Sequence, residues 1–193
     1  WVGRMARAGV PTVQLRFKHT DPARIAQEVQ AAVAAVAGTP ARLFINDHWH
    51  AAIAAGAYGV HLGQEDLDAL TPDDIAQLRA SGVRLGVSTH GYAEMARALA
   101  VGPSYIALGA VFPTTLKAMP TAPQGPGRLR RYARAARHVP TVAIGGIGLA
   151  ELPAVAASGV GSFAVVRAIT GSLDPEAAAA ELMAAWARLQ RAP

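Results

Sequence analysis

Residues 41–66 read ARLFINDHWHAAIAAGAYGVHLGQED, in which two short apolar runs flank an alanine-rich segment. The runs at 42–45 and 59–62 are apolar on both faces, as is typical of strands buried in a parallel sheet. The alanine-rich segment at 50–55 favours a helix between them. The stretch therefore predicts a strand–helix–strand unit with polar residues directly after each strand.

Seven such units follow one another after a first helix expected at 2–8. The expected strands span residues 12–16, 42–45, 59–62, 84–87, 105–108, 141–144 and 162–166. The expected helices span residues 21–37, 50–55, 72–80, 92–100, 127–136, 149–157 and 174–189. This alternation predicts one α/β domain over residues 1–193, a (β/α)8 TIM barrel. Such a barrel has one more strand before the first helix, so we expect that first strand to be absent from this chain.

A doubly wound open sheet is the alternative to the barrel. Such sheets normally carry a glycine-rich phosphate loop after their first strand, whereas the glycine pair here, Gly145-Gly146, comes late in the chain. The pattern therefore favours the barrel. A long connection at 110–126 without helical periodicity is then expected on the C-terminal face, where barrel enzymes carry their active sites.

Composition narrows the classes of function. The 193 residues include no cysteine, which excludes disulfides and thiolate metal sites and fits a reducing cytoplasm. Apolar runs stay well short of the roughly 20 residues that span a bilayer, and no secretory signal is visible. We therefore expect a cytoplasmic location and no membrane partner. The net charge of +5 favours anionic partners.

Arginines recur every three residues along one expected helix, at Arg128, Arg131, Arg134 and Arg137. Only Tyr132 interleaves with them, so stacking on bases is poorly supported. We interpret this stripe as a solvated helix face and expect no nucleic-acid partner. Phosphorylated small molecules are then the expected partners.

Three polar side chains lie on one side of the first expected strand and its extension, namely Gln14, Arg16 and Lys18. An arginine and a lysine that point into a barrel mouth require anions to pair with. Neighbouring carboxylates are one source of such anions, and a bound anionic ligand is the interpretation we favour.

Carboxylates follow the next two strands, in Asn46-Asp47 and in Gln64-Glu65-Asp66. Asp47 and Asp66 suit Mg²⁺, which binds one or two carboxylates together with substrate phosphates. Each aspartate alone could instead cap the following helix. Next to Arg16 and Lys18, the pair favours a metal–diphosphate site.

Histidines offer weaker signals. Zinc ligation by His48, His50 and His61 is conceivable, but residues two apart diverge on a helix, which favours surface or packing roles. His90 follows another strand end, at Ser88-Thr89, where a role in the barrel mouth and a structural role remain open.

A second anion site is indicated near the late strands. Thr114 and Lys117 lie in the long connection, and Gly145-Gly146 leaves room for backbone N–H groups to approach an anion. Val166-Arg167 opens a possible short helix, and barrels often bind phosphate at such a place. Glycine pairs also occur simply in tight turns.

In these stretches the chain resembles the thiamine phosphate synthase family, from about Val13 to Ile169. The motifs that carry the resemblance are VQLR with Lys18, FIND at 44–47, GVHLGQEDL at 59–67, GVSTH at 86–90, FPTT with Lys117, and AIGGI at 143–147. The resemblance implies that the chain joins an aminopyrimidine diphosphate to a thiazole phosphate. Pyrophosphate would be released through a Mg²⁺-assisted dissociative displacement.

The resemblance also implies roles for residues. Those expected to hold the pyrimidine diphosphate are Gln14, Arg16, Lys18, Asn46 and Lys117. Asp47 and Asp66 are implied to bind Mg²⁺, and Ser88 to lie beside the reacting methylene. The catalytic set is thus Ser88, Lys117 and Arg16. Residues expected to bind the thiazole phosphate are Thr114, Gly146, Val166 and Arg167.

Two substitutions depart from the family pattern, Leu116 for a threonine and Arg167 for a serine. The sister family of thiazole tautomerases carries a histidine where this chain has Ala110. A tautomerase and a non-catalytic phosphate-binding barrel remain the alternative functions. Association into a homo-oligomer is a further expectation.

Overall fold

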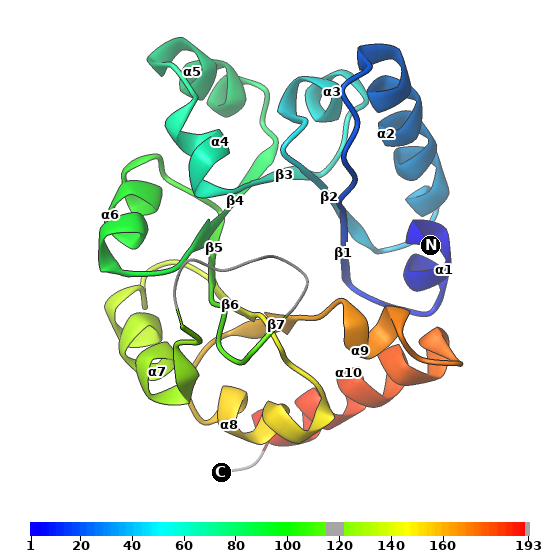
Figure 1. Cartoon of the computed structure of the whole chain (residues 1–193). Coiled ribbons are helices and arrows are strands. Elements are labelled where there is room, and N and C mark those ends of the chain that lie inside the picture. The colour runs from blue at the N-terminus through cyan, green and yellow to red at the C-terminus, as the bar shows by residue number, and fades with distance from the viewer. Residues whose placement is uncertain (115–121, 192–193) are drawn as a thin grey trace. The chain divides into compact units, whose positions relative to one another are not determined.

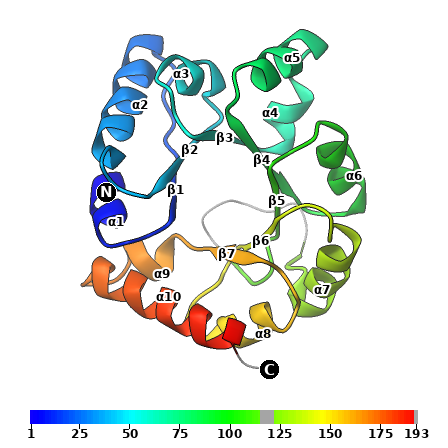
Figure 2. The same ribbon diagram turned by 180° about the vertical axis from the view of Figure 1, so that it is seen from behind.

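The computed structural model describes residues 1–114 and 122–191. The chain divides into two compact units, Trp1–Val87 and Ser88–Pro193. Each unit is built from parallel strands and the helices that follow them along the chain (Figures 1 and 2). The repeated strand–helix order predicted from the sequence is therefore confirmed in both units.

The first unit begins with a helix and then alternates strands and helices. Its strands are β1 (Thr12–Leu15), β2 (Arg42–Asn46), β3 (Gly59–Leu62) and β4 (Arg84–Thr89), the last two residues of which belong to the second unit. Its helices are α1 (Val2–Arg7), α2 (Pro22–Val36), α3 (Trp49–Ala54), α4 (Gln64–Asp68) and α5 (Pro72–Ala80). Strands that are neighbours in the sequence pair in parallel, so that Gln14 lies opposite Phe44 and Asn46 opposite His61.

The core of the first unit lies between its strands and the helices beside them. Leu43, Ile45, Val60 and Leu62 from the strands are almost fully buried, and they pack with Val29 of α2. Side chains buried on both faces of β2 and β3 are what the apolar runs predicted. Because these two strands are fixed by the core, the polar residues that follow them are held at defined positions.

The second unit has three strands of its own, β5 (Tyr105–Leu108), β6 (Thr141–Ile144) and β7 (Ser162–Ala164). Its helices are α6 (Tyr92–Ala100), α7 (Gly125–Ala135), the 3₁₀ turn η1 (Leu149–Glu151), α8 (Leu152–Ala156), α9 (Arg167–Thr170) and α10 (Pro175–Arg191). β5 pairs with β6, and β6 with β7, both in parallel. Helices α8 and α10 lie side by side in both views (Figures 1 and 2).

Differences from the predicted elements are small and local. The five residues of α4 were not predicted, because so short a helix shows no periodicity. The helix expected at 149–157 is split into η1 and α8. The strand expected at 162–166 ends at Ala164, since Val166 already caps α9.

The arginine stripe is exposed at all four positions, which confirms its interpretation as a solvated face. Its last member, Arg137, lies beyond the end of α7. Within the described residues, every helix is too short or too polar to cross a bilayer.

Candidate functional site

The chain after β1 presents polar side chains to solvent. Gln14, Arg16 and Lys18 are exposed, whereas Leu15 and Phe17 are partly buried and pack against the core of the first unit. The alternation predicted from the sequence is confirmed and continues past the end of the strand. It leaves two cationic groups available to an anion on the same side of the chain.

Asp47 is held in an unusual backbone conformation directly after β2. Its φ is +65°, in the left-handed region that few residues other than glycine adopt. Its backbone N–H donates to the carbonyl oxygen of His61 on β3 at 3.0 Å. Asn46, just before it, is buried with 6% of its surface exposed. Non-glycine residues in this region gather at functional sites, because the surroundings must hold them there.

Asp66 lies in the first turn of α4. The residue that caps this helix is Gly63, and His48 occupies the same position before α3. Neither aspartate is therefore the N-cap residue of the following helix, and Asp66 is instead the third residue of α4.

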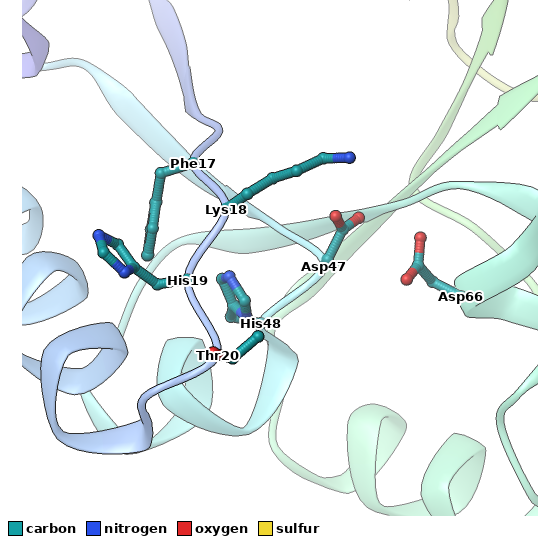
Figure 3. Close-up of a pocket in the computed structure, with 7 residues that line it drawn as sticks. All are labelled: Phe17, Lys18, His19, Thr20, Asp47, His48 and Asp66. Carbon is teal, nitrogen blue, oxygen red and sulfur yellow. The ribbon is translucent and has the colours of Figure 1, made fainter.

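The side chains of both aspartates line one open pocket of about 560 Å³ in the first unit. Figure 3 shows Asp66 pointing toward Asp47, with the ammonium group of Lys18 reaching the same side of the pocket. The other lining residues are Phe17, His19, Thr20 and His48. The structure thus brings two predicted metal ligands and one predicted diphosphate ligand together.

His61 lies next to these charged groups and is buried, with 5% of its surface exposed. Burial, and to a smaller extent the nearby Arg16 cation, lower the pKa of His61 to about 4, against the opposing influence of the Asp66 carboxylate. The imidazole is therefore neutral at pH 7. Both charged groups act on this imidazole, so Arg16 and Asp66 lie near His61 although they come from distant parts of the sequence.

The donor set suits a hard cation bound partly by substrate. Within residues 1–114 and 122–191, no group of three or more His, Asp or Glu side chains converges as a preformed metal site. Two carboxylates fit Mg²⁺, which usually completes its ligands with water and phosphate oxygens. The zinc alternative gains no support, because His50 stacks on Trp49 while His48 packs 4.9 Å from the Phe17 ring.

The residues predicted to bind the second phosphate lie in the second unit. The backbone N–H groups of Val111 and Phe112 donate to the carbonyl oxygens of Ile144 and Gly145, at 2.9 and 3.0 Å. These two hydrogen bonds hold the residues after β5 beside the end of β6. Thr114 is partly buried at the end of this described stretch.

Gly145 and Gly146 both adopt positive φ, +92° and +67°. A Cβ atom on Gly145 would collide with Ala110, and one on Gly146 with Phe112 and Pro113. The pair is therefore required by the close approach of the chain after β5. The prediction that it also admits an anion stays a prediction.

Val166 and Arg167 follow β7 and are exposed, at the cap and first residue of α9. The short helix predicted there is confirmed. Ala164 pairs with Ile144, so that the residues after β6 and β7 leave the sheet from adjacent positions. Ser88 lies within β4 and is partly buried. Lys117 and Leu116 lie outside the described residues.

Sequence reasoning missed two groups of residues. His48 was assigned to a surface or packing role and Phe17 was given no role, yet both line the pocket beside Asp47. Glu94 and Gln124 bind the turn after β4, as described below. The four-residue spacing of His90 and Glu94 was a usable signal. For Gln124 there was none, because its partners His90 and Gly109 are far away in the sequence.

Comparison with known proteins gives a consistent family. The family model described as thiamine monophosphate synthase matches residues 1–169. Thiamine-phosphate synthase of Neisseria meningitidis serogroup B is 55% identical over 186 residues, which cover 96% of this chain and 89% of the relative. The enzyme of the same name from Serratia proteamaculans is 52% identical over 183 residues, or 95% of this chain and 85% of the relative.

Among solved structures, thiamine phosphate pyrophosphorylase from Pyrococcus furiosus matches with a TM-score of 0.83 and 28% identity. The match covers 97% of this chain and 88% of that chain. The predicted α/β fold of the TIM-barrel class is confirmed by this similarity.

Proposed function

The chain belongs to the thiamine monophosphate synthase family and is an enzyme, and from that premise we propose its substrates and the roles of its residues. It joins 4-amino-2-methyl-5-hydroxymethylpyrimidine diphosphate to a thiazole phosphate, giving thiamine phosphate and pyrophosphate. The observation that carries the proposal is the pocket in which Asp47, Asp66 and Lys18 meet.

The pocket in the first unit takes the diphosphate. Lys18 lines it, and Arg16 lies close enough to His61 to lower the pKa of that imidazole. Two cations beside a leaving group offset the negative charge that grows on it as the carbon–oxygen bond breaks. Lys117 adds a third cation in the proposal, and Gln14 and Asn46 hold the aminopyrimidine.

Asp47 and Asp66 hold Mg²⁺, in keeping with the preference of this ion for carboxylate and phosphate oxygens. When bound, the ion supplies further positive charge against the diphosphate. Asp47 is well suited to this role because its backbone is fixed by the hydrogen bond to β3. A ligand that is held in place before binding loses less conformational freedom when the ion arrives.

The thiazole phosphate binds in the second unit, at Thr114, Gly146, Val166 and Arg167. Ser88 lies beside the pyrimidine methylene in this proposal. The amino-substituted ring spreads positive charge from the methylene as diphosphate leaves, so no protein nucleophile is needed. The thiazole nitrogen then forms the new carbon–nitrogen bond.

A thiazole tautomerase is the alternative within the same fold. That activity moves protons and needs a titratable group, whereas Ala110 is a buried methyl side chain packed against Gly145. We therefore favour the synthase. The cytoplasmic location and the oligomeric state stay predictions.

The test is formation of thiamine phosphate from the two substrates, with Mg²⁺ and then with excess chelator. Asp66→Ala should abolish the Mg²⁺-dependent product, while Asp68→Ala is the matched control, since Asp68 is exposed on the same helix. Product that persists in chelator and in folded Asp66→Ala would refute the metal assignment. No product from folded wild-type chain would refute the synthase assignment.

A further inference from the structure

The turn after β4 is held by a cluster that the proposed function leaves unused. One carboxylate oxygen of Glu94 accepts a hydrogen bond from the backbone N–H of His90 at 2.7 Å. The same oxygen lies 2.8 Å from Nδ1 of the His90 ring. Because a carboxylate only accepts, Nδ1 carries the proton and donates it. Both the backbone and the ring of His90 are thus tied to the first turn of α6.

Gln124 binds the same turn from the other side. Its amide Nε2 donates to the carbonyl oxygen of His90 at 2.5 Å and to that of Gly109 at 2.8 Å. Its backbone N–H donates to the carbonyl oxygen of Ala110 at 2.9 Å. The side chain is buried, with 8% of its surface exposed. An amide nitrogen has two protons, so both serve to join the turn after β4 to the end of β5.

This cluster continues toward the glycine pair after β6. The backbone N–H of Gly109 donates to the carbonyl oxygen of Thr89 at 3.2 Å. Three residues beyond Gly109, the N–H of Phe112 donates to the carbonyl oxygen of Gly145 at 3.0 Å. A hydrogen-bonded path therefore runs within the second unit from the turn next to Ser88, through Gln124, to Gly145. It connects groups that the proposed function assigns to different substrates.

We propose that Gln124 is a positioning residue, which keeps the turn that carries Ser88 at a fixed spacing from the glycine pair. The inference rests on the proposed function. That spacing directs the pyrimidine methylene to the thiazole nitrogen. No side chain in the cluster contacts the reacting atoms; it acts through the backbone that holds them.

The chemistry offers two fates for the methylene carbon. The bond from this carbon to the diphosphate oxygen breaks, and its electron pair leaves with the diphosphate. In coupling, the thiazole nitrogen supplies the electron pair of the new carbon–nitrogen bond. In hydrolysis, a water oxygen supplies the pair, a carbon–oxygen bond forms, and the proton is lost to solvent. A small error in position slows coupling more than hydrolysis, because coupling requires the thiazole nitrogen to be held in line with the methylene carbon.

The experiment compares pyrophosphate released with thiamine phosphate formed, under saturating substrates. Gln124→Met keeps the length of the side chain and removes both donors. Glu94→Gln is the second variant, at a more exposed position, and it keeps the shape of the side chain while removing the charge that strengthens the hydrogen bonds to His90. Gln190→Met, on the exposed face of α10, is the matched control. Circular dichroism establishes that each variant is folded.

We expect the ratio of pyrophosphate to thiamine phosphate to rise severalfold in Gln124→Met and less in Glu94→Gln. In Gln190→Met it should equal that of the wild type. If the folded variants are slower but keep the wild-type ratio, the cluster only stabilises the fold and the inference is wrong. If Gln124→Met does not fold, the ratio of pyrophosphate to thiamine phosphate in Glu94→Gln decides: a wild-type ratio there refutes the inference. A wild-type chain without any product refutes the proposed function instead.

Discussion

The backbone N–H of Asp47 donates a hydrogen bond to the carbonyl oxygen of His61, at 3.0 Å across the ends of β2 and β3. This contact holds Asp47 at a φ of +65° and directs its carboxylate to the pocket that Asp66 also lines. A carboxylate fixed by a neighbouring strand is a better metal ligand than one on a free loop, because its orientation is set before the ion binds.

Asp47 allows stability and activity to be separated. Asp47→Gly should raise the free energy of unfolding relative to Asp47→Ala by about 1 kcal/mol, because glycine adopts the left-handed region without strain. Both variants lack the carboxylate, and both should lose on the order of 100-fold or more in kcat/KM. Thermal denaturation and the coupled assay measure the two effects. Equal stability of the two variants would show that the backbone is not strained there.

Lys18 should act on the diphosphate substrate. Lys18→Met removes a charge-assisted contact and should lower kcat/KM for the pyrimidine diphosphate by about 10- to 100-fold. Arg42→Met is the matched control, because Arg42 lies at the other end of β2 from Asp47 and over the ring of Tyr58. The assignment fails if both variants lower kcat/KM to the same extent.

The two glycines after β6 should be intolerant of a side chain. Gly145→Ala combines a positive φ with a collision against Ala110 and should lower the free energy of unfolding by about 3 kcal/mol. Gly159→Ala is the control: its φ is +78° and an added Cβ would meet no atom within 4 Å, so only about 1 kcal/mol is expected. Urea denaturation compares them, and similar losses would contradict the packing argument.

His61 makes stability depend on pH. Its pKa is about 4 when folded and 6.5 ordinarily, so the unfolded chain binds a proton that the folded chain does not between these values. Stability is then highest above pH 6.5 and falls as the pH drops toward 4. The loss amounts to about 3 kcal/mol.

The measurement is urea denaturation at several pH values between 4 and 6.5. His61→Gln should flatten the dependence in this range, and His138→Gln, at an exposed position, should leave it unchanged. Asp74 is a separate contributor. The hydroxyl and backbone of Thr71 lower the pKa of its carboxyl, so that its contribution is lost only below its ordinary value of 3.8. An unaltered slope in His61→Gln would rule out His61 as the source.

Much of the fold could be predicted from the sequence because its signals are local. The apolar run at Gly59–Leu62 and the helix expected at 72–80 depend only on neighbours along the chain. The alternation along the first strand predicted that Gln14, Arg16 and Lys18 lie on the same side of the chain. The proximity of Asp47 and Asp66 was predicted as well, because the carboxyl ends of adjacent parallel strands meet at one edge, and their role as metal ligands stays a prediction.

The tertiary structure decided everything that requires two distant segments to be in register. The burial of His61 among charged groups and the left-handed backbone of Asp47 follow from the pairing of β2 with β3. Gln124 meets His90 across 34 residues of sequence, and no local pattern marks that contact. The spacing of residues along a chain specifies local conformation. Hydrogen bonds between distant residues depend instead on how the strands and loops pack, and that packing is determined by many residues together and not by any local pattern.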